Sequence, residues 1–83
     1  MMSYLVYAIR SELDARIYVG FTKDLERRLK EHNSGRTKST KGYIPWKIIY
    51  KEVVETRKEA RQRELFFKSG SGKEFLKRVA PAP

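Results

Sequence analysis

Short apolar runs alternate with polar segments along the chain, and they predict a small β-sheet. Tyr4 to Ile9 and Arg16 to Phe21 are β-branched and aromatic runs, and the polar segment 11–15 separates them. This pattern is typical of a β-hairpin whose loop is longer than two residues. If the two strands pair antiparallel, Tyr7 and Tyr18 can approach each other on one face of the sheet.

A third apolar run predicts a third strand. It extends from Trp46 to Val54 and begins directly after Pro45. Proline is tolerated at the start of a strand, where it breaks no interior hydrogen bond. In this run Ile48 and Tyr50 are expected on one face, alternating with Lys47, Ile49 and Lys51.

The segment after the hairpin has the spacing of a helix. Thr22 is a plausible N-cap for a helix to about His32, which Asn33-Ser34-Gly35 would end. One stripe of this helix mixes core and polar residues at helical spacing: Leu25, Arg28, Leu29 and His32. Arg27, Lys30 and Glu31 are expected to point elsewhere, as ordinary solvated charges.

Two capping signatures predict further helices after the third strand. Thr56-Arg57-Lys58-Glu59 has the form of a capping box and predicts a helix to about Lys68. Ser71-Gly72-Lys73-Glu74 repeats the signature after Ser69-Gly70 and predicts a short helix through about Arg78. The expected fold class is therefore α+β, with a three-stranded antiparallel sheet flanked by about three helices.

Length and composition narrow the classes of protein. Eighty-three residues suffice for one domain with a thin core, so we expect a single domain over 1–83 with a loose tail at about 79–83. No stretch approaches the length of a spanning helix, and the N-terminus has no secretory pattern. Cysteine is absent, which excludes disulfides and thiolate metal sites. A cytoplasmic protein without membrane association is the expectation.

The charge predicts a polyanionic partner. The formal net charge is +9, and clustered Lys and Arg gain affinity by displacing counterions from phosphates. Residues 34–45 form a polar, cation-rich stretch without helix or strand pattern, which is typical of a functional or a disordered loop. We expect the nucleic-acid contacts to come from cations in and around this region: Arg27, Arg36, Lys38, Lys41 and Lys68. A ribosomal-type or merely soluble basic protein is the alternative that charge alone leaves open.

Five residues could carry hydrolytic chemistry on a phosphodiester: Tyr7, Tyr18, Arg28, His32 and Glu64. Phenols, a cation, an imidazole and a carboxylate are the groups needed to activate a water, bind phosphate and hold a metal ion. Each also has a plain structural explanation. Strand propensity accounts for the tyrosines, and a neutral half-buried position accounts for His32. Arg28 could extend its charged end from an apolar stem into solvent, and Glu64 could form an i,i+4 ion pair with Lys68.

The order of these residues resembles that of the GIY-YIG endonuclease superfamily. Leu5-Val6-Tyr7 is similar to the first motif of that family, and Tyr18-Val19-Gly20 is similar to the second. The match continues almost position by position through Asn33. The chain is most similar to small standalone bacterial members, which are related to the N-terminal nuclease domain of the excinuclease subunit that incises damaged DNA. The resemblance extends from about Tyr4 to about Lys77.

The resemblance implies a metal-dependent endonuclease acting on DNA, with RNA not excluded and a role in repair or on unusual DNA structures. Glu64 would hold Mg²⁺ or Mn²⁺, and Arg28 would clamp the scissile phosphate. Tyr7 and Tyr18 would line the site, and Gly20 would allow a backbone or a phosphate to come close. The resemblance does not decide which residue is the general base, and we rank Tyr7 first and His32 second. A protein partner that supplies specificity is a further expectation.

Three departures from the family pattern leave alternatives open. Leu5 replaces a glycine, Phe21 replaces a residue that is often polar, and no asparagine follows Asn33. Lys68 and Ser69 are the candidates to replace the missing asparagine. A nucleic-acid-binding module without turnover, a catalytic subunit that needs its partner, and an RNA-associated basic protein are the competing hypotheses.

Overall fold

The computed structural model describes residues 3–81, and it contains one sheet and three α-helices. The elements in chain order are β1 (Tyr4–Ser11), β2 (Ile17–Thr22), α1 (Leu25–Asn33), the 3₁₀ turn η1 (Lys41–Tyr43), β3 (Trp46–Val54), α2 (Arg57–Lys68) and α3 (Gly70–Val79). The sheet is antiparallel with the order β2-β1-β3. The predicted fold class is confirmed. No helix within the described range is long and apolar enough to cross a membrane.

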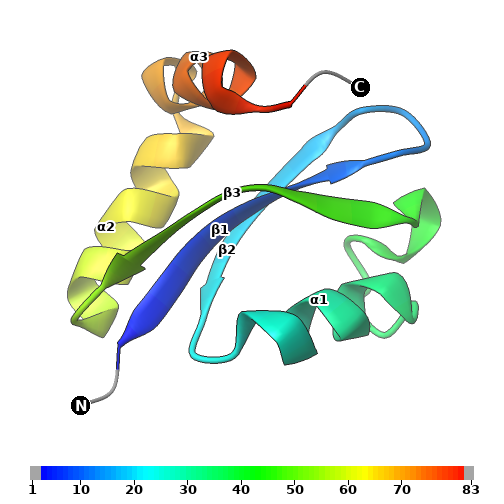
Figure 1. Ribbon diagram of the computed structural model, residues 1–83, viewed down its shortest axis with the longest axis horizontal. Coiled ribbons are helices and arrows are strands. Elements are labelled where there is room, and N and C mark those ends of the chain that lie inside the picture. The colour runs from blue at the N-terminus through cyan, green and yellow to red at the C-terminus, as the bar shows by residue number, and fades with distance from the viewer. Residues whose placement is uncertain (1–2, 82–83) are drawn as a thin grey trace.

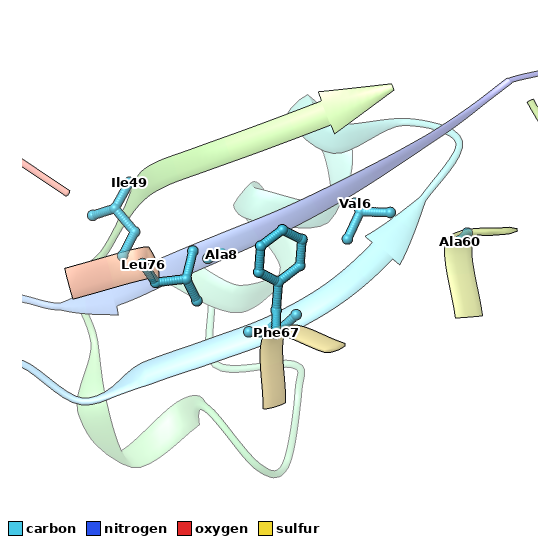
Figure 2. Packing of buried hydrophobic residues seen from close by; sticks show 7 residues of the cluster. Val6, Ala8, Ile49, Ala60, Phe67 and Leu76 are labelled. Atoms are coloured by element: carbon cyan, nitrogen blue, oxygen red, sulfur yellow. The ribbon is translucent and has the colours of Figure 1, made fainter. Parts of the chain in front are cut away.

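The central strand β1 separates two apolar clusters, one on each face of the sheet. Helices α2 and α3 lie on one side of the sheet and α1 on the other (Figure 1). Figure 2 shows the first cluster, in which the ring of Phe67 from α2 lies among Val6 and Ala8 of β1 and Leu76 of α3. The second cluster joins Tyr7 and Ile9 of β1 to α1 and to the start of β3, and it contains the candidate site.

The hairpin register places the two tyrosines as expected. Ile9 pairs with Tyr18, and Tyr7 pairs with Gly20. Directly opposed residues in a sheet point to the same face, so Tyr7 and Tyr18 are diagonal neighbours on the face that α1 covers. The predicted approach of the two phenols on one face is therefore confirmed.

The predicted alternation within β3 is wrong, although its bounds are confirmed. The pairing with β1 shifts between Ala8 and Ile9, because Ala8 opposes Tyr50 whereas Ile9 opposes Ile48. Ile49 is the extra residue of this bulge. As a result, Ile49 and Tyr50 both pack in the cluster under α2 and α3, whereas Ile48 packs in the cluster on the α1 side.

Two of the three predicted helix starts need correction. Thr56 caps α2 as expected, since its side chain accepts from the Glu59 N–H at 3.1 Å. Thr22 does not cap α1, because it is still paired with Leu5 in the sheet. The cap is Asp24, which accepts from the Arg27 N–H.

The third helix begins earlier and ends later than predicted. Its cap is Ser69, which accepts from the Gly72 N–H, rather than Ser71. Val79, assigned to the loose tail from sequence, belongs to α3. Residues 82–83 of the predicted tail, and residues 1–2 of the N-terminus, lie outside the described part of the chain.

The close packing of α3 on α2 depends on Gly72. A Cβ at this position would overlap with the backbone of Phe66 and Phe67. Those atoms belong to a helix backbone that cannot rotate away as a flexible side chain could. The Gly72→Ala substitution should therefore lower the free energy of unfolding by about 1–3 kcal/mol, as overpacking does, in urea denaturation.

Gly70→Ala is the matched control, because a Cβ there would have no heavy atom within 4 Å. Alanine is a better helix former than glycine, so this variant should be as stable as the wild type or slightly more stable. Equal stability of the two variants would contradict the close helix packing at Gly72.

Candidate active site

The position of Tyr7 depends on the glycine that faces it across the hairpin. Tyr7 is 2% exposed, and a Cβ at Gly20 would lie 2.8 Å from its hydroxyl oxygen. The phenol therefore lies across the backbone of β2, in space that only a glycine leaves open. The sequence suggested that Gly20 admits a backbone or a phosphate. In the structure the group that comes close is the Tyr7 ring.

The hydroxyl of Tyr7 is hydrogen-bonded to a buried histidine. It lies 2.9 Å from Nε2 of His32, and Nδ1 of His32 lies 2.9 Å from Oγ1 of Thr40. His32 and Thr40 are both fully buried. The helical stripe predicted from Arg28 and His32 thus points His32 into the sheet, and a loop residue completes its hydrogen bonds.

The partners of Thr40 determine where the protons lie. Its hydroxyl donates to the carbonyl oxygen of Thr37, so its lone pair is free to accept from Nδ1–H of His32. Nε2 then carries no proton and accepts from the Tyr7 hydroxyl. The hydrogen-bond chain therefore directs the Tyr7 proton toward His32.

Burial holds both groups of this pair neutral. It lowers the pKa of His32 to about 4, and the nearby Arg28 cation acts in the same direction. Burial also raises the pKa of Tyr7 to about 12, although Arg28 partly offsets this. At neutral pH the pair is a phenol and an uncharged imidazole. The plain structural explanation for His32, a neutral buried residue, agrees with its protonation state.

Tyr18 forms the open side of the site. It is half-buried on the edge strand β2, and its ring centroid lies 5.0 Å from that of His32. The ring also contacts Trp46 edge-on at 6.4 Å. Tyr18 therefore packs against the imidazole while part of it remains accessible from solvent.

Arg28 is held beside the phenol by an acid that the sequence analysis assigned to solvent. Its Nη1 donates to Glu31 Oε1 at 2.9 Å, and both side chains are about one-third exposed. This ion pair lowers the pKa of Glu31 and raises that of Arg28. The expectation that Glu31 points away as a solvated charge is wrong, although its i,i+3 spacing from Arg28 is visible in the sequence.

Glu64 projects from α2 and is paired with two cations. Arg61 Nη1 donates to one carboxylate oxygen, and Lys68 Nζ donates to the other at 3.1 Å. Glu64 is 9% exposed, and its negative charge is one of the smaller contributions to the raised pKa of Tyr7, after burial. The i,i+4 pair with Lys68 that the sequence suggested is therefore present, together with a second pair to Arg61.

A divalent ion at this place would depend on Glu64 and on water. Within residues 3–81, no three His, Cys, Asp or Glu side chains gather where they could hold a metal. Magnesium is usually bound through one or two carboxylates and several waters, so the donor set fits this ion better than a metal that needs a protein cage. The Arg61 side chain is 59% exposed and the Lys68 side chain is 50% exposed, so both have room to move away from Glu64.

The cations predicted to bind nucleic acid occupy several surfaces. Arg27 and Arg36 line a shallow hollow of about 280 Å³ on the outer side of α1. Lys38 and Lys41 are exposed on the loop that follows. Lys68 is set apart from these four on α2, where it pairs with Glu64.

Thr40 is the site residue that the sequence analysis missed. It lies in a loop without periodicity, and no motif spacing marks one threonine among its Ser, Thr, Gly and Lys neighbours. Only the fold shows that its hydroxyl meets His32. The loop itself is also more regular than expected, because it includes the η1 turn directly after Thr40.

Comparison with known proteins places this geometry in a family context. A UPF0213 protein of Bacillus licheniformis is 43% identical over 61 residues, which are 72% of this chain and 63% of that protein. A UPF0213 protein of Staphylococcus saprophyticus is 33% identical over 81 residues, covering 96% of this chain and 98% of the relative. The solution NMR structure of a UPF0213 protein of Bacillus halodurans is 32% identical, with a TM-score of 0.58 over 99% of this chain and 89% of that one.

A family model gives the same assignment as the resemblance in the motifs. The family model described as the GIY-YIG catalytic domain matches residues 3–78, which include both strand motifs, α1 and Glu64 of α2. The chain therefore belongs to the GIY-YIG catalytic domain family, a family of nucleases.

Proposed function

We propose that this protein is a divalent-metal-dependent endonuclease that hydrolyses phosphodiester bonds in DNA. The observation that carries the proposal is the buried hydrogen bond from Tyr7 to His32, with Arg28 and Glu64 beside it. Buried tyrosine–histidine pairs can be structural, but here the Arg28 guanidinium is hydrogen-bonded to the same phenol and the charge of Glu64 acts on its pKa. Metal-dependent phosphodiester hydrolysis uses three functions together: a proton acceptor, a phosphate ligand and a metal ligand.

Tyr7 and His32 would act in series on the attacking water. As the water oxygen forms its bond to phosphorus, one water proton moves to the Tyr7 oxygen, and the Tyr7 proton moves to Nε2 of His32. This transfer avoids a free phenolate, which a pKa of about 12 makes costly at neutral pH. Tyr7 is then the immediate base, and His32 is the group that receives the proton.

Arg28 would bind the scissile phosphate. Glu31 occupies one of its N–H groups, and the guanidinium has five donors in a planar fork, so other donors remain for phosphate oxygens. Glu31 would also hold the fork in place beside Tyr7. A lysine could not reproduce this arrangement, because it presents one point charge without a planar pair of donors.

Glu64 would hold the divalent ion after Arg61 or Lys68 moves away. When bound, such an ion supplies positive charge that stabilises the leaving oxygen and the phosphate oxygens. The leaving oxygen takes its proton from solvent. Because Tyr7 and His32 are both uncharged at neutral pH, the pair would repel neither a cation nor an anionic substrate.

A nucleic-acid-binding module without turnover is the second candidate. The observation that favours it is the pairing of both Glu64 oxygens with cations. If the ion cannot displace Arg61 or Lys68, the carboxylate only stabilises α2, and the basic surface binds without cutting.

The first prediction from this proposal concerns cleavage of labelled duplex, single-stranded, flap and branched DNA and of matched RNA. With Mg²⁺ the wild type should cut at least one of the DNA substrates, and EDTA should abolish cutting. Glu64→Gln and Arg28→Lys should each lower the rate by about 10²–10³, as the loss of one electrostatic stabiliser does.

Glu55→Gln and Arg78→Lys are the matched controls, because both residues are exposed and lie outside the site. Both controls should cut at the wild-type rate. Tight, salt-sensitive binding without any cutting by the wild type would instead support the binding module.

The second prediction concerns competition for Glu64. Arg61→Gln removes a cation that an incoming metal ion must displace. Since a partly exposed ion pair is worth up to about 1 kcal/mol, the Mn²⁺ dissociation constant should fall roughly two- to fivefold in a calorimetric titration. Arg78→Gln should leave it unchanged, and weaker binding by Arg61→Gln would argue against Glu64 as the ligand.

The third prediction concerns the charge of His32, the one histidine in the chain. Its folded pKa of about 4 lies below the ordinary value of 6.5, so the unfolded chain binds the extra proton first as pH falls. Stability is thus lost between pH 6.5 and 4.5, by about 2–3 kcal/mol at 1.4 kcal/mol for each pKa unit. Urea denaturation at several pH values measures this loss.

His32→Gln is the comparison for this measurement. It should be less stable at pH 7 but should lose less stability over the same pH range. Imidazole ¹⁵N NMR of the wild type should show the neutral Nδ1–H tautomer at pH 6. An imidazolium signal at that pH would contradict the proposed proton acceptor.

A further inference from the structure

A basic surface separate from the candidate active site lies on the face of the sheet that α2 and α3 cover, next to the edge strand β2. A hollow of about 500 Å³ is formed there by β2 and by the helices α2 and α3. Val19 and Phe67 contribute its buried floor, and Ile17 contributes a half-buried wall. Lys68, Lys73 and Lys77 stand at its rim. This volume lies within the range of pockets that hold small organic groups.

The hollow adjoins the candidate active site through two residues. Tyr18 is among the residues of β2 that line it, and the Tyr18 ring contacts His32 on the opposite face of the sheet. Lys68 also lines it, and its ammonium group donates to Glu64. A DNA strand whose scissile phosphate is bound by Arg28 could therefore place the neighbouring nucleotide in this hollow.

The rim has positive charge that the fold does not use. Lys73 and Lys77 are exposed and lie at i,i+4 on one face of α3. Lys73 has no ion pair within residues 3–81, and the Lys77 pair with Glu74 is long and exposed, at 4.0 Å. Exposed pairs of this kind are worth little, so both ammonium groups remain free for phosphate.

The apolar part of the hollow distinguishes a single strand from a duplex. A duplex presents its phosphates and sugars to a protein surface and keeps its bases stacked inside, so it gains little from an apolar recess. An unpaired nucleotide can place its base against aromatic and aliphatic side chains while its phosphate meets the cations. Ile17, Val19 and the lysine stems offer such a surface beside the ammonium groups of Lys73 and Lys77.

We propose that this hollow binds an unpaired nucleotide of the DNA strand, next to the phosphate that is cut. The proposal rests on the proposed nuclease function and adds a preference for substrates with a single-stranded segment. The surface is separate from the cations of the loop after α1, because α3 and that loop lie on opposite sides of the sheet (Figure 1).

Equilibrium binding in EDTA tests the proposal without any cleavage. The probes are a fluorescein-labelled single-stranded DNA and a blunt duplex of the same sequence, followed by anisotropy at several salt concentrations. The Lys73→Gln/Lys77→Gln double variant should bind the single strand at least tenfold more weakly. Its salt slope should fall by about 1.4, since each phosphate contact on a single strand contributes about 0.7.

The matched control is Lys51→Gln/Lys58→Gln, which removes the same charge from two exposed lysines away from the hollow. Relative to this control, duplex binding by the Lys73/Lys77 variant should not change. In addition, 2-aminopurine placed at successive positions of the single strand should show altered fluorescence at one position, and only with the wild type and the control.

The outcomes separate this proposal from the proposed function. If the two double variants match each other on the single strand, or if the Lys73/Lys77 variant loses duplex affinity equally, the nucleotide site is wrong even where the wild type cuts DNA. If the single-strand effect appears but no substrate is cut with Mg²⁺, the nucleotide site stands and the proposed activity falls. A wild type that binds no single strand overturns the nucleotide site.

Discussion

The arrangement of the site depends on one close approach, that of the Tyr7 ring to the backbone of Gly20. Any side chain at residue 20 would meet the phenol, and the ring would have to leave the space between β2 and α1. Its hydroxyl would then lose Nε2 of His32, which lies 2.9 Å away. The glycine of the second strand motif therefore acts through the tyrosine of the first. This explains physically why two short motifs that are far from unique alone carry information as a pair.

A buried series of hydrogen-bonded side chains in so small a protein is stable only if each polar group has a hydrogen-bond partner. Tyr7, His32 and Thr40 are all buried, yet no buried side-chain nitrogen or oxygen in the described part of the protein lacks a hydrogen bond. An unpaired polar group at this depth would cost about 1–3 kcal/mol, a large fraction of the stability of a small domain. The contact of the Thr40 hydroxyl with the Thr37 carbonyl, at 3.4 Å, favours the Nδ1–H tautomer of His32, in which the Tyr7 hydroxyl donates to Nε2. Stability and the proposed chemistry thus require the same hydrogen bonds.

The sequence predicted the parts of this structure that follow from local periodicity. The three strands, the bounds of α2 and the shared face of Tyr7 and Tyr18 all follow from alternation and capping patterns. Two errors were local, the cap of α3 and the ion pair of Glu31 with Arg28, and the others arose where a contact between distant elements decided the outcome. Thr22 stays in β2 because Leu5 pairs with it, and Ile49 turns toward α2 because β3 bulges against β1. Thr40 could not be found at all, because its importance comes from a contact with a histidine eight residues earlier in the chain.

The loop from 34 to 45 illustrates why composition alone could not decide between a functional and a disordered segment. Its cations are exposed, which suits either description. Hydrogen bonds to the residues that flank the loop, Asn33 and Trp46, nevertheless fix its position. Trp46 Nε1 donates to the carbonyl of Thr40, and Asn33 exchanges two hydrogen bonds with the backbone of Trp46. Moving the loop would therefore disturb the residue that orients His32. The exposed cations and Thr40 therefore belong to one segment, in which the solvated residues vary the charge of the surface while the buried threonine is fixed by hydrogen bonds to His32 and Trp46.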